Sequence, residues 1–107
     1  MIKKYNKLVR DKIPEIIMQQ GNTPKVATLT DAEYFTALNQ KLTEEVAEYL
    51  EDYSIEELAD IMEVVYAIAK HRGLSREELE KLRFDKRNNR GAFDKKICLL
   101  EVQMNQQ

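Results

Sequence analysis

Several features are scarce in this chain of 107 residues. It contains one cysteine, Cys98, so no disulfide can form within the chain, and a reducing compartment fits this usage. The most apolar segment, residues 61–69, is interrupted by Glu63, so the sequence predicts no transmembrane span and no membrane partner. The basic start of the chain is not followed by an apolar stretch with a small-residue cleavage site. We therefore expect no secretion signal and a cytoplasmic location.

Positive charge is missing from one part of the chain. Residues 44–60 contain no lysine or arginine, yet they hold eight of the 19 acidic residues. Basic residues are in excess in residues 1–12 (+4) and in residues 81–96 (+5). An acidic centre flanked by basic segments suits a divalent metal held together with a polyphosphate. A helical protein with solvated charged faces is the alternative interpretation of this composition.

The remaining composition narrows the class of protein. Hydrophobic residues make up 43% of the chain and charged residues 34%, which excludes a disordered chain. A chain of this length buries enough surface for one core, so we expect a single domain over residues 1–107. The basic segments lack interleaved aromatic residues and the centre is acidic, so no nucleic-acid partner is expected.

Hydrophobic periodicity and capping signals predict a compact all-α fold with four helices. The first ends before Gly21, the second runs from Thr30 to about Asp52, the third runs from Ser54 to Gly73, and the fourth runs from Ser75 to Arg90. Residues 25–29 and 96–102 resemble short strands and are expected to pair as a minor two-stranded β element, with Cys98 in its core. Two long helices with broad apolar faces also suggest a homo-oligomer, a dimer or a tetramer.

Four carboxylates are expected to point inward on the second and third helices. Glu45 lies within the apolar stripe of the second helix and Glu48 on its edge, while Glu57 and Asp60 point at packed surface on the third helix. A carboxylate that faces the core is costly unless it is paired or binds a metal. Residues three apart share a helix face, so each pair offers two oxygen donors of the kind that Mg²⁺ prefers.

The four inward acids differ in how well other roles explain them. Glu57 is the third residue after Ser54, so it could simply complete a capping box at the start of the third helix. Asp60 lies in a helix interior, where aspartate is a poor helix former and has no capping role. We expect the four carboxylates to converge, and Glu51, Asp52 and Glu56 to point into solvent.

The spacing of these acids resembles a known signature. Glu44-Glu45-x-x-Glu48 followed by Glu57-x-x-Asp60 is similar to the E-E-x-x-E…E-x-x-D pattern of the MazG-like, all-α nucleoside triphosphate pyrophosphohydrolase superfamily. Residues 5–14, YNKLVRDKIP, and the later Lys86-x-x-x-Arg90-Gly91-x-Phe93 look like a small subfamily often labelled phosphoribosyl-ATP pyrophosphohydrolase-like. One departure is the gap of eight residues between Glu48 and Glu57, which is shorter than is usual in the superfamily.

The resemblance implies Mg²⁺-dependent cleavage of a nucleoside triphosphate, canonical or non-canonical, to the monophosphate and pyrophosphate, with Mn²⁺ as a possible substitute. By motif position it implies four metal ligands: Glu45, Glu48, Glu57 and Asp60. A carboxylate that is not fully committed to metal, Glu44 or Glu45, would align the attacking water. Cations that stabilise the polyphosphate are expected among the basic residues of the two flanking motifs: Lys7, Arg10, Lys12, Lys86 and Arg90.

Two alternatives remain open from the sequence. The first is phosphoribosyl-ATP hydrolysis in histidine biosynthesis, which belongs to the same superfamily. The second is a non-catalytic helical module that uses its acids to hold a metal or a basic partner.

Overall fold

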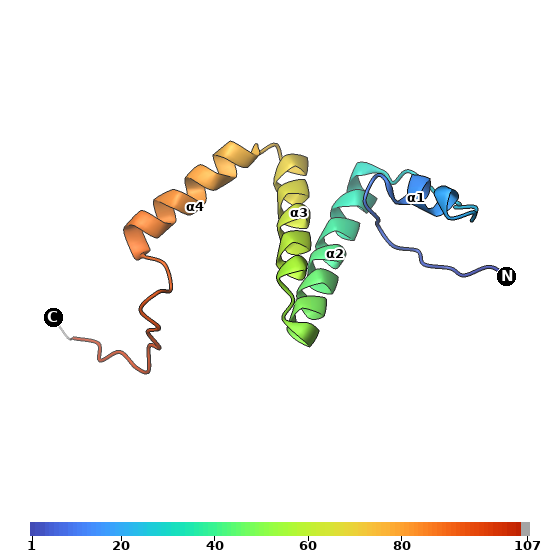
Figure 1. Ribbon diagram of the computed structural model, residues 1–107. Helices are drawn as coiled ribbons and strands as arrows, with labels where there is room; N and C mark the ends of the chain where they lie inside the picture. Colours follow the sequence, from blue (N-terminus) through green and yellow to red (C-terminus); the bar gives the residue numbers. More distant parts are fainter. Residues whose placement is uncertain (106–107) are drawn as a thin grey trace. The chain divides into compact units, whose positions relative to one another are not determined.

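The structure, a computed structural model, describes residues 1–105, which form four helices and no strand (Figure 1). The helices are α1 (Ile13–Gln19), α2 (Asp31–Asp52), α3 (Ile55–His71) and α4 (Arg76–Arg90). The prediction of an all-α fold with four helices is confirmed for this part of the chain. Contacts divide the chain into two compact units, Met1–Arg76 and Glu77–Gln107, so the single domain over residues 1–107 stays a prediction.

A helical hairpin formed by α2 and α3 dominates the first unit (Figure 1). Tyr53 ends α2 in a left-handed conformation, with φ 58° and ψ 28°, and its N–H donates to the carbonyl of Tyr49 at 2.7 Å. Ser54 is extended, and α3 begins at the next residue. The chain therefore reverses within two residues, which brings α3 against α2. At the other end of the hairpin, the His71 ring stacks on Phe35 with centroids 5.6 Å apart.

Few side chains are buried in this unit. Among residues 1–105, Leu38 and Val64 are the buried hydrophobic side chains, with 2% and 9% of their surface exposed, and Glu45 is buried beside them. Other apolar side chains of the hairpin stay open to solvent, such as Leu50 at 59% and Met62 at 52%. The contact between α2 and α3 is thus narrow, and a carboxylate takes part in it.

The minor β element differs from its prediction. Residues 25–29 and 96–102 are both irregular, and Cys98, predicted to be in a core, is exposed. A strand needs a partner for its backbone groups, and the weak alternation of residues 25–29 gives residues 96–102 no well-defined apolar strand to pair with. No helix among the described residues has the length and apolar character needed to cross a bilayer.

The helix starts show which capping signals act. Thr30 and Glu33 form the predicted capping box: the Glu33 N–H donates to Thr30 Oγ1 at 3.3 Å, and the Thr30 N–H donates to Glu33 Oε1 at 2.9 Å. Ser54, which has the same spacing to Glu57, makes no side-chain cap bond. Its N–H donates instead to Asp52 Oδ1 at 3.0 Å. Capping therefore does not explain Glu57.

Replacing Thr30 with alanine is expected to lower the free energy of unfolding by about 1 kcal/mol, because the N-terminal donors of α2 lose their acceptor. Ser54→Ala is the matched control and is expected to change stability by less than about 0.5 kcal/mol, since its hydroxyl caps nothing. Urea denaturation followed by circular dichroism measures both. Equal losses in the two variants would contradict this assignment of the caps.

Candidate functional site

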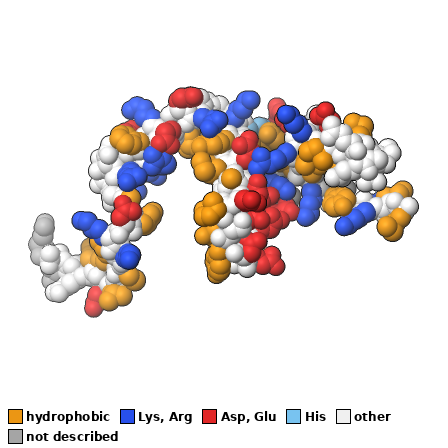
Figure 2. Space-filling view, in the orientation of Figure 1, with side chains coloured by type: hydrophobic (Ala, Val, Ile, Leu, Met, Phe, Trp, Pro, Cys, Tyr) orange, Lys and Arg blue, Asp and Glu red, His pale blue; other side chains and the backbone are white. Residues whose placement is uncertain are grey.

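Three carboxylates meet between α2 and α3. Glu45 comes from α2, and Glu57 and Asp60 come from α3; one oxygen of each lies within 4.8 Å of the others. Glu57 and Asp60 are three residues apart, so they share one face of α3, and that face meets Glu45. Figure 2 shows acidic side chains gathered over the hairpin, with hydrophobic side chains along its other edge. The two helices thus bring like charges together at short range.

Two oxygen atoms of this cluster are buried without a hydrogen-bond partner. They are Oε2 of Glu45 and Oε2 of Glu57. The Glu45 side chain is only 9% exposed, so bulk solvent has little access to it. A buried carboxylate oxygen without a partner is costly, and proteins usually satisfy such atoms with a donor or a cation. The unsatisfied oxygens are the feature of the cluster that points to a ligand.

Two cations already contact the cluster. The Lys41 ammonium lies 3.3 Å from Glu45 Oε1, one helical turn away on α2. The Arg10 guanidinium donates a hydrogen bond to Asp60 Oδ1 at 2.6 Å, which ties the N-terminal segment to α3. Within residues 1–105, Glu57 has no ion pair. The negative charge of the cluster is therefore partly neutralised, at Glu45 and Asp60 but not at Glu57.

Glu44 lies beside the cluster and has a different environment. It accepts a hydrogen bond from the Lys7 ammonium at 2.8 Å, and Lys41 lies 3.7 Å from its other oxygen. The hydrogen bond from Lys7 is the main reason that the pKa of Glu44 is lowered from its ordinary value. The same contact raises the pKa of Lys7. Glu44 is thus held in its charged form.

The pKa values of Glu45 and Glu57 are shifted in the opposite direction, upward. Burial is the main cause that raises the pKa of Glu45, with further contributions from the charges of Glu48 and Asp60, and Lys41 offsets part of the shift. Burial also comes first for Glu57, whose pKa is raised further by neighbouring carboxylates, Glu48 foremost. Both side chains thus resist ionisation in the absence of an added cation.

The other predicted site residues lie in several places. Glu48 is close enough to influence the two raised pKa values but lies outside the group of three. Lys12 is exposed at the N-cap of α1. Lys86 and Arg90 are exposed on α4, in the second unit. Their predicted contact with substrate stays a prediction.

Lys41 is a site residue that the sequence analysis missed. Its spacing to Glu44 and Glu45, three and four residues, is the signal that would have found it, because such residues are neighbours on a helix. The acids predicted to point into solvent, Glu51, Asp52 and Glu56, are exposed. The distinction between inward and outward acids therefore holds for these three.

The donor set fits a hard divalent cation. Carboxylate oxygens are the protein ligands that Mg²⁺ takes, often one or two per ion, with waters and phosphates as the remaining ligands. Glu45, Glu57 and Asp60 offer three, and two of them carry oxygens that lack a partner. A cation here would satisfy those oxygens and neutralise their repulsion.

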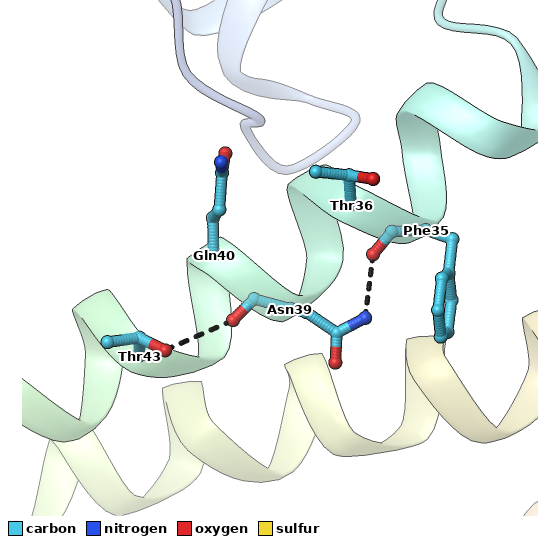
Figure 3. A pocket seen from close by; sticks show the side chains of 5 residues that line it. All are labelled: Phe35, Thr36, Asn39, Gln40 and Thr43. Carbon is cyan, nitrogen blue, oxygen red and sulfur yellow. Dashed lines mark hydrogen bonds between the residues drawn. The ribbon is translucent and has the colours of Figure 1, made fainter.

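A shallow pocket of about 380 Å³ lies elsewhere on α2 (Figure 3). It is lined by uncharged side chains: Phe35, Thr36, Asn39, Gln40 and Thr43. Asn39 donates to the Phe35 carbonyl at 2.8 Å and Thr43 to the Asn39 carbonyl at 3.3 Å, so these polar groups mainly serve α2 itself. Helical spacing places Thr36 and Thr43 on the side of α2 opposite Glu45. The carboxylate cluster remains the better candidate site.

Comparison with known proteins gives little functional information. No family model matches the chain, and no solved structure matches it. An uncharacterized protein of Mycolicibacterium smegmatis is 61% identical over 41 residues. The match covers 38% of this chain and 42% of that protein, so the chain spans less than half of the length of this relative.

Neutralising Glu57 is expected to stabilise the metal-free protein at pH 7. Because its pKa is raised above 4.5, the free energy of unfolding of the unmodified protein falls as the pH rises from about 4.5 through the raised pKa. Glu57→Gln removes this loss, so the variant is more stable at pH 7, and its advantage disappears below about pH 4.5. Urea denaturation in EDTA at a series of pH values measures the difference.

Glu44→Gln is the matched control for that experiment and is expected to change the free energy of unfolding in the opposite direction. The lowered pKa of Glu44 means that its charge contributes stability above about pH 4.5, which is lost as the pH falls through the lowered value. The variant is therefore less stable than the unmodified protein at pH 7. A Glu57→Gln variant that is no more stable at pH 7 would refute the electrostatic description of the cluster.

Millimolar Mg²⁺ or Mn²⁺ is expected to raise the melting temperature by about 10 °C or more, the shift for an ion present at roughly a hundred times its Kd. Glu45→Gln and Asp60→Asn should abolish the shift, and Glu51→Gln, at an exposed position of α2, should keep it. Differential scanning calorimetry with and without EDTA measures these shifts. A melting temperature that neither ion moves would exclude the metal site.

Proposed function

We propose that the protein is a Mg²⁺-dependent nucleotide pyrophosphohydrolase of MazG-like fold, which cleaves a nucleoside triphosphate to the monophosphate and pyrophosphate. The observation that carries the proposal is the convergence of Glu45, Glu57 and Asp60, with two buried oxygens that lack partners. The acidic signature and both flanking motifs support the same assignment. Mn²⁺ is expected to replace Mg²⁺.

The three converging carboxylates would hold the metal, with Glu48 beside them as the fourth predicted ligand. A divalent ion bound there supplies neutralisation of the polyphosphate charge and a more acidic water. All three carboxylates project from helices, which suits a site that needs fixed ligand positions. The turn at Tyr53 and Ser54 is compatible with the short gap between Glu48 and Glu57.

The basic N-terminal segment would bind the phosphates. Lys7 and Arg10 already lie at the site, paired with Glu44 and Asp60. These pairs are partly exposed, so phosphate oxygens can compete for the same donors. Lys12 follows in the same segment, and for Lys86 and Arg90 on α4 substrate binding stays a prediction.

Glu44 and Glu45 are the two candidates for aligning the attacking water. In the metal-free protein the pKa of Glu45 is raised, mainly by burial. Glu44 is held in its charged form by Lys7, so it is a weaker base and better suited to positioning Lys7. Either role uses a carboxylate that the fold already holds at the site.

The exposed apolar surface of the hairpin supports a homo-oligomer, a dimer or a tetramer. Leu50, Ile55 and Met62 are each more than half exposed, and burying such side chains against a second copy would stabilise the assembly. A cytoplasmic location and a nucleotide as the partner molecule complete the proposal. Phosphoribosyl-ATP is the alternative substrate, because its hydrolysis releases the same pyrophosphate.

Release of pyrophosphate from a panel of nucleotides tests the proposal. With Mg²⁺, the unmodified protein is expected to form pyrophosphate and a monophosphate from at least one nucleotide. Asp60→Asn and Glu45→Gln should each lower kcat by roughly a hundredfold or more, because each removes a ligand of the charge-stabilising centre. Glu51→Gln should keep full activity.

The products distinguish the alternatives in that experiment. Orthophosphate in place of pyrophosphate would contradict the proposed bond cleavage. Activity confined to phosphoribosyl-ATP would select the alternative substrate. Metal binding without hydrolysis of any nucleotide would favour the non-catalytic module.

A further inference from the structure

Lys41 occupies an unusual position for a surface lysine. Its ammonium lies 3.3 Å from Glu45 Oε1 and 3.7 Å from Glu44 Oε2, and its side chain is only 22% exposed. It therefore bridges the most buried carboxylate of the cluster and the carboxylate that anchors Lys7. No other cation contacts Glu45 among residues 1–105. Lys41 is the counter-ion of Glu45 in the protein without added metal.

We infer that Lys41 competes with the metal for Glu45 and is then released to a phosphate group of the substrate. The inference rests on the proposed function and deepens it. A divalent cation that takes Glu45 as a ligand is repelled by an ammonium at the same carboxylate. Repulsion between the two cations therefore opposes metal binding at Glu45 Oε2 for as long as the ammonium stays at Oε1.

The surroundings of Lys41 determine where its ammonium goes. Glu44 stays within reach, but Lys7 already neutralises much of its charge. A triphosphate bound at the cluster brings several anionic oxygens, which attract an ammonium more strongly than one shared carboxylate does. The long, flexible lysine stem allows the head group to move while the stem stays packed on α2. The Lys41 ammonium thus leaves Glu45 and binds a phosphate group of the substrate.

Mn²⁺ binding tests the first step without any catalysis. Titration followed by electron paramagnetic resonance of free Mn²⁺ gives the Kd for the unmodified protein and for Lys41→Met, Lys41→Arg and Lys70→Met. Lys41→Met keeps most of the stem and removes the charge, so its Kd should fall about threefold or more. Lys41→Arg keeps the charge and should match the unmodified protein. Lys70→Met, ten residues beyond Asp60 on exposed α3 surface, is the control and should also match it.

A Kd for Lys41→Met that equals or exceeds that of the unmodified protein would overturn the inference. Melting curves of the metal-free variants show whether each is folded at the titration temperature. A purely structural Lys41 would lower the melting temperature of Lys41→Met without tightening Mn²⁺ binding. That outcome also overturns the inference.

Steady-state kinetics test the second step. With saturating Mg²⁺, Lys41→Met should raise the KM for the triphosphate about threefold or more while kcat changes by less than about twofold, and Lys41→Arg should restore KM. An unchanged KM would overturn the release of Lys41 to substrate. If the unmodified protein hydrolyses no nucleotide, the proposed function fails, whereas the Mn²⁺ titration still decides whether Lys41 competes with the metal.

Discussion

Repulsion between carboxylates held at short range is the constraint on which the first unit depends. Two helices place Glu45, Glu57 and Asp60 together, and this arrangement is tolerable only with positive charge nearby. Lys41 and Arg10 supply part of it, each at a different carboxylate. The position of the N-terminal segment against the hairpin follows from the same need, because Arg10 reaches the cluster from outside the helices.

The site depends on helix geometry more than on a large core. Leu38 and Val64 are the buried apolar side chains of the described residues, and Glu45 lies with them in the contact between α2 and α3. In most small domains such central positions are apolar. A charged residue there lowers stability, and unsatisfied groups of this kind usually mark functional sites.

Local features of the sequence predicted most of the helical structure. The capping box at Thr30, the break at Tyr53 and the glycine after α3 are short-range signals, and each helix forms where they indicate. The inward direction of Glu45 and Glu57 also follows from periodicity. The prediction of strands at residues 25–29 and 96–102 was wrong, because strand pairing depends on a partner segment that periodicity does not identify. The contact of Lys41 with Glu45 and the position of Glu48 outside the group of three depend on side-chain conformations. A helical wheel gives the direction of a side chain but not its contacts.

The two ion pairs that join the N-terminal segment to the hairpin have a consequence for its response to solution conditions. Lys7–Glu44 and Arg10–Asp60 connect residues 37 and 50 positions apart, and all four side chains are partly exposed. Salt weakens exposed ion pairs, because the screening length is about 8 Å at physiological ionic strength and shortens as salt is added. The burial of Leu38 and Val64 is not weakened in this way. Ionic strength thus acts selectively: it loosens the segment that carries Lys7 and Arg10 and leaves the helices that carry the acids in place.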